Sequence, residues 1–247
     1  MENRALGAKK RESTQAGTRP SEAFKTMILK EIYLYPDLGE FSDEIIHPFR
    51  DQSRSICNFL ERSLSAEKFE TPNFKKICFV GTRQAVNEPY VNSSGALIVN
   101  VGLDTELYKK CTSANELNEF FIQLLLEGLE KCRPHIALPL DLLKNSMDEF
   151  RRNHYKNEWT FKQKKIKGSD YVCALECQLT IDCFLMNLKV LRKDTPVLDK
   201  EILRTAPDEI AFGPYLKDLK EEGGRIKVID KSGVAFYTTT VSSLDKL

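Results

Sequence analysis

The densest group of side chains able to do chemistry is a basic segment between Arg151 and Lys167. It holds seven Lys and Arg residues against one acid, Glu158, and it carries the only tryptophan, Trp159. Such a combination can hold phosphates and stack bases. It can equally meet an acidic protein surface through charge attraction and an aromatic anchor. The residues predicted to bind are Arg151, Arg152, Lys156, Trp159, Lys162 and Lys164.

A purely structural role is the competing interpretation of this basic segment. Trp159 and Phe161 alternate with polar residues, so both can pack inward while the lysines coat an exposed strand and discourage pairing with other chains. The acidic stretch from Glu31 to Glu44 contains no Lys or Arg and can neutralise the basic segment within the molecule. The sequence leaves both alternatives open.

A divalent-metal site is the second candidate. A metal-dependent nuclease needs a carboxylate on one strand and a Glu-x-Lys or Glu-x-Gln on its partner, since these groups gather a hard cation beside a polar helper. Glu176 and Gln178 offer the second half, with Asp182 close in sequence, but the preceding strand has only Glu158 near its far end. A solvated strand face is favoured, and a nuclease-like enzyme is kept as an alternative.

Catalysis or metal binding through histidine and cysteine has less support. The three histidines are scattered, and no Gly-x-Ser-x-Gly or cysteine-family signature accompanies them. The seven cysteines include no Cys-x-x-Cys pair. On one extended strand, Cys173, Cys177 and Cys183 would stand too far apart to share a zinc ion. We therefore predict no catalytic residue, no metal and no cofactor.

Length and composition limit the class of protein. The chain has 247 residues, of which 41% are hydrophobic and 30% charged, with 37 Lys and Arg against 36 Asp and Glu. This is enough apolar material for a core, and the charge balance argues against overall disorder. No apolar run approaches the ~20 residues of a membrane helix, and residues 1–20 lack the apolar segment of a secretion signal. We expect a cytoplasmic protein without membrane contact.

The elements that position the basic segment follow from hydrophobic periodicity. Residues 1–22 hold almost no bulky apolar side chain and are expected to form a flexible basic arm before a single domain over residues 23–247. Helices are expected from Pro48 to Ser65, from the capping box Ser113–Glu116 to Pro134, and from Asp141 to Tyr155. Core strands are expected over residues 76–80 and 96–101.

The second half of the chain changes to a period of two. Residues 171–185 alternate between apolar and polar, which predicts one long half-buried strand, and a change of parity near Phe184 predicts a bulge or bend there. Short helices are expected over Lys200–Arg204 and Tyr215–Glu221, before a terminal hairpin over residues 225–241. Because strands and helices do not alternate strictly, we predict an α+β fold: a mixed, mainly antiparallel sheet with three to five helices packed on it.

A non-enzymatic protein that binds a macromolecular partner is the function this pattern favours. The chain lacks compact catalytic signatures but has a substantial core and segregated charge. An inhibitor or immunity-type protein that neutralises a toxin or effector would have these properties, and so would an adaptor. A protein partner is expected. The alternatives are a nucleic-acid-binding protein that uses residues 151–167 and a divalent-metal-dependent, nuclease-like enzyme.

Overall fold

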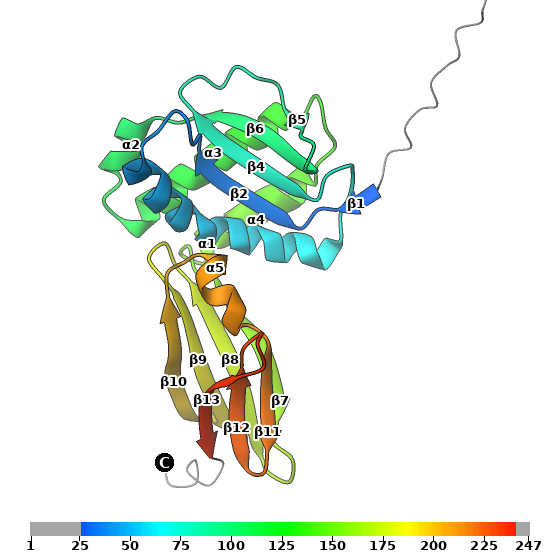
Figure 1. The fold of residues 1–247 in the computed structure, drawn as a ribbon, viewed down its shortest axis with the longest axis vertical. Helices are drawn as coiled ribbons and strands as arrows, with labels where there is room; N and C mark the ends of the chain where they lie inside the picture. Colours follow the sequence, from blue (N-terminus) through cyan, green and yellow to red (C-terminus); the bar gives the residue numbers. More distant parts are fainter. Residues whose placement is uncertain (1–25, 241–247) are drawn as a thin grey trace, which may run out of the picture.

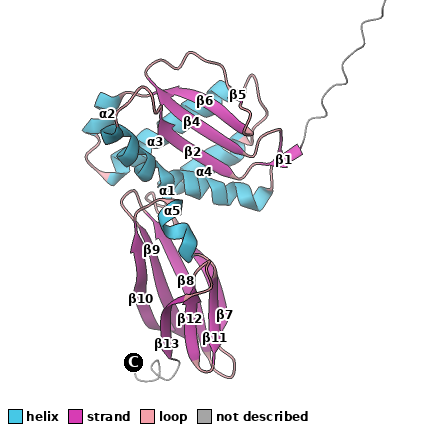
Figure 2. Cartoon of the chain, in the orientation of Figure 1, coloured by secondary structure: helices cyan, strands magenta, loops and turns pink. Residues whose placement is uncertain are grey.

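The computed structural model describes residues 26–240, whose helices and strands form two lobes joined end to end (Figures 1 and 2). The first lobe, residues 26–155, carries the long helices and a mixed sheet. The second lobe, residues 156–240, is built almost entirely from antiparallel strands. The predicted α+β class is confirmed, and the strands divide among four sheets, one of them mixed. The basic arm predicted for residues 1–22 lies outside the described residues.

The first lobe has a four-stranded sheet in the order β2-β4-β6-β5, in which β5 alone runs antiparallel to its neighbour. Its strands are β2 (Glu31–Pro36), β4 (Lys76–Thr82), β5 (Tyr90–Val91) and β6 (Ala96–Gly102). A separate pair is formed by β1 (Thr26–Ile28) and β3 (Glu70–Pro72). The helices are α1 (Asp43–Glu67), α2 (Thr105–Lys110), α3 (Ala114–Cys132) and α4 (Leu140–Arg152).

Helices α1, α3 and α4 share one core with the central strands of this lobe. Phe79 on β4 and Val99 on β6 are fully buried and belong to the same apolar cluster as Phe121 of α3 and Phe150 of α4. The strands predicted over residues 76–80 and 96–101 are therefore confirmed as core strands. Continuous apolar runs are typical of parallel strands covered by helices, which is why these two strands could be predicted from the sequence.

Helix α3 begins at the capping box predicted from the sequence. The Ser113 Oγ accepts a hydrogen bond from the Glu116 N–H at 3.2 Å, and Glu116 Oε2 accepts one from the Ser113 N–H at 3.1 Å. Helix α1 differs from expectation, because it starts at Asp43 and contains Pro48 in its interior rather than at its first turn. A proline so close to the N-terminus removes only one backbone hydrogen bond, so the helix continues through it.

The second lobe consists of two antiparallel sheets that enclose a second core (Figure 2). One sheet has the order β10-β9-β8-β7 and the other the order β11-β12-β13. The strands are β7 (Glu158–Lys165), β8 (Tyr171–Leu179), β9 (Phe184–Arg192), β10 (Thr195–Thr205), β11 (Asp218–Glu222), β12 (Arg225–Ile229) and β13 (Ala235–Thr240). A short helix, α5 (Glu209–Phe212), and a 3-10 turn over Gly213–Tyr215 connect the two sheets. The terminal hairpin is confirmed as far as residue 240.

The single long strand expected over residues 171–185 is wrong. The chain reverses at a two-residue turn, where the Thr180 N–H donates to the Cys183 carbonyl at 2.9 Å and the Thr180 Oγ1 accepts from the N–H groups of Asp182 and Cys183. The turn changes which residue parity faces the core, so Leu179 points inward before it and Phe184 after it. The parity change near Phe184 therefore marks the turn of a hairpin, and not a bulge or bend within one strand.

Both short helices predicted for the second lobe are also wrong. Residues 200–204 belong to β10, whose register on β9 shifts at Pro196/Leu198 and at Glu201/Leu203. These register shifts place apolar residues next to each other in the sequence, and the resulting spacing resembles that of a helix. Pairing with β9 nevertheless makes this segment a strand. Residues 215–221 include the end of the 3-10 turn and most of β11, which pairs with β12. Gly223 and Gly224, with φ values of 58° and 73°, form the turn between these two strands.

Three direct hydrogen bonds join the two lobes where α1 crosses the top of β8 (Figure 1). The Ser55 Oγ donates to the Leu179 carbonyl at 2.7 Å, and the Asn157 Nδ2 donates to the Ser55 carbonyl at 2.8 Å and to the Asn58 side chain at 3.2 Å. Ile181, from the β8–β9 turn, belongs to the core of the first lobe. The single domain over residues 23–247 stays a prediction.

A buried guanidinium reinforces this junction. Arg54 of α1 donates Nη1 to the Ile32 carbonyl at 2.7 Å, Nη2 to Glu61 at 3.1 Å and Nε to Glu209 at 2.8 Å. The Arg54 guanidinium carbon lies over the Tyr33 ring, 4.9 Å from the ring centre. Because Glu209 lies on α5, this one side chain ties β2 and α1 of the first lobe to the second lobe.

No helix within residues 26–240 is long and apolar enough to span a bilayer.

We predict that Gly128→Ala destabilises the first lobe. Gly128 of α3 packs so closely on the sheet that an added Cβ would lie 2.3 Å from Phe79 Cδ1, whereas a Cβ at Gly102 would meet nothing nearer than 3.8 Å. Overpacking of this kind costs about 1–3 kcal/mol. Urea denaturation should show that loss for Gly128→Ala and a much smaller one for the control Gly102→Ala. Equal losses would contradict the close packing.

Glu61 makes the free energy of unfolding depend on pH. Burial raises the pKa of its carboxyl from 4.5 to about 7, against the lowering effect of Arg54 and the Ile32 N–H. Between these values the folded chain holds more protons than the unfolded chain, so stability falls as pH rises from 4.5 through 7. At about 1.4 kcal/mol per pKa unit, the loss is on the order of 3 kcal/mol.

Urea midpoints at pH 5 and pH 8 test this prediction. Glu61→Gln should flatten the difference in unfolding free energy between the two pH values, because the amide does not titrate. Glu67→Gln, an exposed change on the same helix, is the matched control and should keep the pH dependence of the original chain. An unchanged pH dependence in Glu61→Gln would rule out this carboxyl as its source.

Candidate binding site

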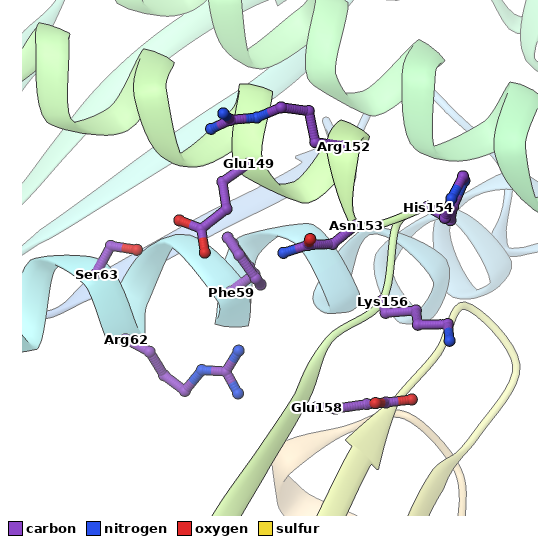
Figure 3. Close-up of a pocket in the computed structure, with 9 residues that line it drawn as sticks. All are labelled: Phe59, Arg62, Ser63, Glu149, Arg152, Asn153, His154, Lys156 and Glu158. Carbon is purple, nitrogen blue, oxygen red and sulfur yellow. The ribbon is translucent and has the colours of Figure 1, made fainter.

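A pocket of about 640 Å³ lies where α1, the end of α4 and the start of β7 meet (Figure 3). Helices α1 and α4 of the first lobe and strand β7 of the second contribute to it, so it exists only when the lobes are joined. Its lining residues are Phe59, Arg62, Ser63, Glu149, Arg152, Asn153, His154, Lys156 and Glu158.

Arg62 on α1 is one of the three Lys and Arg residues that line the pocket. Its guanidinium carbon lies 5.4 Å from the centre of the Phe59 ring and 4.6 Å from that of Trp159, so it contacts one aromatic ring from each lobe. Burial lowers the pKa of Arg62. Its Nη1 is buried and makes no hydrogen bond to any residue between 26 and 240. A buried donor left without a partner is energetically costly.

The rim of the pocket carries exposed charges of both signs. Arg152 and Lys156 supply cations, and Glu149 and Glu158 supply carboxylates (Figure 3). Within the described part of the chain, none of these four side chains forms an ion pair, and Arg152 makes only a 3.3 Å hydrogen bond to the Asp148 carbonyl. Exposed charges without internal partners remain available to charges on another molecule.

The backbone that turns α4 into β7 is strained beside this pocket. His154 and Tyr155 have φ values of 55° and 57°, which place both in the left-handed region. The His154 N–H donates to the Arg151 carbonyl at 3.0 Å and the Tyr155 N–H to the Phe150 carbonyl at 2.8 Å. This is a Schellman ending, in which glycine normally takes the position held by His154. The chain keeps a side chain with two ring nitrogens at the pocket instead of the favoured glycine.

Arg151 does not belong to the pocket, although the sequence predicted it with Arg152. Its guanidinium makes a two-bond ion pair with Glu119 of α3, at 2.9 and 2.7 Å, and a third bond to Asp148 at 3.0 Å. Arg151 holds the pKa of the Glu119 carboxyl below its usual range. Its role in the structure is therefore to fasten α4 to α3.

Lys162 and Lys164 lie on β7 away from the pocket. A bulge between Thr160 and Lys162 places both lysines opposite inward-facing residues of β8, on the same face of the sheet as Trp159. They are exposed because β7 is the edge strand. The pKa of Glu222 on β11 is lowered first by a hydrogen bond from Lys227, and Lys164 adds to this effect.

The structural interpretation of the basic segment is correct in part. Trp159 and Phe161 are half-buried against the core of the second lobe, with the Trp159 ring 6.0 Å from that of Phe184. Among residues 26–240, no ion pair links the acidic stretch Glu31–Glu44 to residues 151–167. Lys156 and Arg152 are exposed at the pocket, and the half-buried Arg62 lies over the Trp159 ring.

The outward face of the second lobe gathers the other candidates. Glu176 and Gln178 share a hollow of about 350 Å³ with Glu158, and Thr160 Oγ1 donates to both Glu176 oxygens at 2.9 and 3.0 Å. Asp182 lies apart from it, in the turn between β8 and β9. The sequence missed two further carboxylates of this hollow, at positions 199 and 201 on β10. No three His, Cys, Asp or Glu side chains in the described residues are arranged to hold a metal ion.

Sequence reasoning also missed the α1 side of the pocket. Phe59 and Arg62 are three residues apart, so they lie on one face of the helix, and this spacing is the only local signal. Their connection to Trp159 depends on how the lobes meet. The resulting site offers a half-buried guanidinium beside exposed charges of both signs. The chain matches no family model, no curated protein and no solved structure.

We predict that His154→Gly stabilises the protein, because glycine adopts a positive φ without the penalty of a Cβ. The free energy of unfolding should rise by up to about 1 kcal/mol, measured by urea denaturation. His154→Ala is the control: it removes the imidazole but keeps the Cβ, so it should give no such gain. A similar rise in both variants would show that the ring, and not the backbone conformation, is the source of strain.

Proposed function

We propose that this protein is a non-enzymatic binding protein whose pocket between the lobes receives an acidic side chain of a partner protein. The observation that carries the proposal is Arg62, which lines the pocket with its guanidinium over the rings of Phe59 and Trp159. A planar guanidinium forms paired hydrogen bonds with a carboxylate, and holding it rigid reduces the entropy lost on binding. Arg152 and Lys156 on the rim would attract the same carboxylate.

A protein partner fits the pocket better than a nucleic acid does. Glu149 and Glu158 line the same pocket and would repel a polyanion, whereas a protein can set Lys or Arg against them. The Trp159 ring is covered by Arg62, so that face is not open for stacking a base. The mixture of charges therefore supports recognition of a surface that carries both signs.

Neutralisation of a toxin or effector is the role we propose for this binding. An inhibitor or immunity-type protein acts by occupying a surface, and a pocket built on two packed lobes presents its charges in one arrangement. The proposed location is the cytoplasm, since all seven cysteines are free thiols, as is typical of a reducing compartment.

Capture of partners from a native lysate of the source organism tests the proposal. Arg152→Glu and Lys156→Glu each reverse an exposed charge of the pocket, and we expect each to weaken retention of the partner at least tenfold, about 1.4 kcal/mol. The matched controls are Lys162→Glu and Lys164→Glu, which make the same change on exposed lysines of β7 outside the pocket. These two should retain the partner as the original chain does.

Other outcomes would contradict the proposal in different ways. Loss of the partner only in the Lys162 and Lys164 variants would move the binding surface to the edge of β7. A captured component that disappears after nuclease treatment, with binding that weakens steeply as salt increases, would show nucleic-acid binding instead. Retention of the same partner by all four variants would exclude both surfaces.

A further inference from the structure

A second hollow, of about 710 Å³, lies in the first lobe and is lined by residues of α2 and α3. Its floor is apolar and is formed by Leu107 and Cys111 on one side and by Phe120, Leu124 and Leu126 of α3 on the other. Leu107 is 52% exposed, although it is a large apolar residue on a surface helix. An open apolar groove between two helices is a common place for a peptide helix to bind.

The rim of this groove is acidic. Five carboxylates line it, and no Lys, Arg or His does; they are Asp104, Glu116, Glu119, Glu127 and Glu130. Glu119 is paired with Arg151, and Glu130 with Lys144 and Arg133. The other three form no ion pair with any residue of the described range, so their negative charge is not neutralised inside the molecule.

These three carboxylates are nevertheless fixed in position. Asp104 accepts hydrogen bonds from the N–H groups that begin α2, and Glu127 accepts one from the Gly102 N–H at 3.0 Å. Glu116 accepts from the backbone of Thr112 and Ser113, which lowers the pKa of its carboxyl. The groove therefore presents an ordered negative rim around an apolar floor.

We infer that this groove binds a cationic amphipathic helix of a partner protein. The lining stripe of α3 runs from Glu116 to Glu130, a length of about 21 Å at about 1.5 Å per residue, which matches a helix of about four turns. The partner's apolar residues, at spacings of three and four, would cover the floor, while its Lys and Arg residues would reach the acidic rim. The chain's own residues 1–22 are basic but have almost no bulky apolar side chain to fill the floor.

This surface differs from the pocket between the lobes in the charge it selects. The pocket receives an acidic side chain at Arg62, whereas the groove receives a basic helix. The two surfaces would let one molecule hold two different partners, as an adaptor does. The inference does not depend on the proposed function, because neither Leu107 nor Glu127 contacts the pocket.

Fluorescence anisotropy with two synthetic peptides tests this inference on the full chain. One 14-residue peptide carries Leu at helical spacings of three and four with Lys elsewhere, and the second replaces every Lys by Glu. We expect the Lys peptide to bind at least tenfold more tightly than the Glu peptide. Leu107→Lys should weaken the Lys peptide at least tenfold, because it places a cation on the apolar floor.

Two further variants sharpen the test. Glu127→Gln keeps an acceptor for the Gly102 N–H but removes the charge, and should weaken the Lys peptide two- to fivefold, as expected for an exposed charge pair. Ile210→Lys makes the same kind of change as Leu107→Lys at an apolar side chain that is 82% exposed in the second lobe. This control should bind the Lys peptide within twofold of the original chain. Circular dichroism of each variant confirms that it is folded.

Three results would overturn the inference. Equal binding of the two peptides would show that the rim charge selects nothing. Binding of the Lys peptide that is unaffected by Leu107→Lys would place the peptide elsewhere. Self-association of the chain in sedimentation that Leu107→Lys abolishes would assign the groove to a second copy of this protein. Lysate capture through the pocket can succeed or fail independently of all three.

Discussion

The Arg54 guanidinium is the contact on which the arrangement of the two lobes depends. It is buried, and it is bonded to the Ile32 carbonyl, to Glu61 and to Glu209. A buried guanidinium loses its hydration, and only complete pairing offsets that cost, so any arrangement that separates Glu209 from Arg54 leaves charges poorly satisfied. The orientation of α5 against α1 is therefore defined by charge as well as by apolar packing. The same crowding by carboxylates keeps Arg54 protonated, although burial alone would lower its pKa.

Helix α1 connects this junction to the candidate pocket. Ser55 is hydrogen-bonded to the end of β8 and to Asn157, which directly precedes β7. One turn further along the same helix, Phe59 faces α4, and Arg62 reaches down to Trp159. Because all these positions lie on one rigid helix, the contacts that join the lobes also define the distance between Arg62 and its two aromatic neighbours. The end of α4, where His154 has a left-handed backbone, lines another side of the pocket. It does not alter the spacing of these residues on α1.

Charge is distributed so that the first lobe presents two different surfaces. At the junction, unpaired groups of both signs surround Arg62, while between α2 and α3 an acidic rim surrounds an apolar floor. Arg151 separates them: it faces α3 and neutralises Glu119, whereas its neighbour Arg152 faces the pocket. Adjacent residues at the end of one helix thus serve different surfaces, because successive helical positions point about 100° apart.

Local pattern was sufficient for the elements that hold their own signals. The α+β class, the capping box of α3, the core strands β4 and β6 and the terminal hairpin were all predictable, because caps, turns and periodicity are properties of neighbouring residues. The charge density around Arg152 and Lys156 likewise indicated part of the candidate site. Tertiary structure decided the rest. Strand β10 resembled a helix because register shifts disturb its alternation, and Arg151 was recruited by Glu119 of another helix. Arg62 meets Trp159 only because the lobes pack together, and a sequence pattern carries no record of which distant surfaces come into contact.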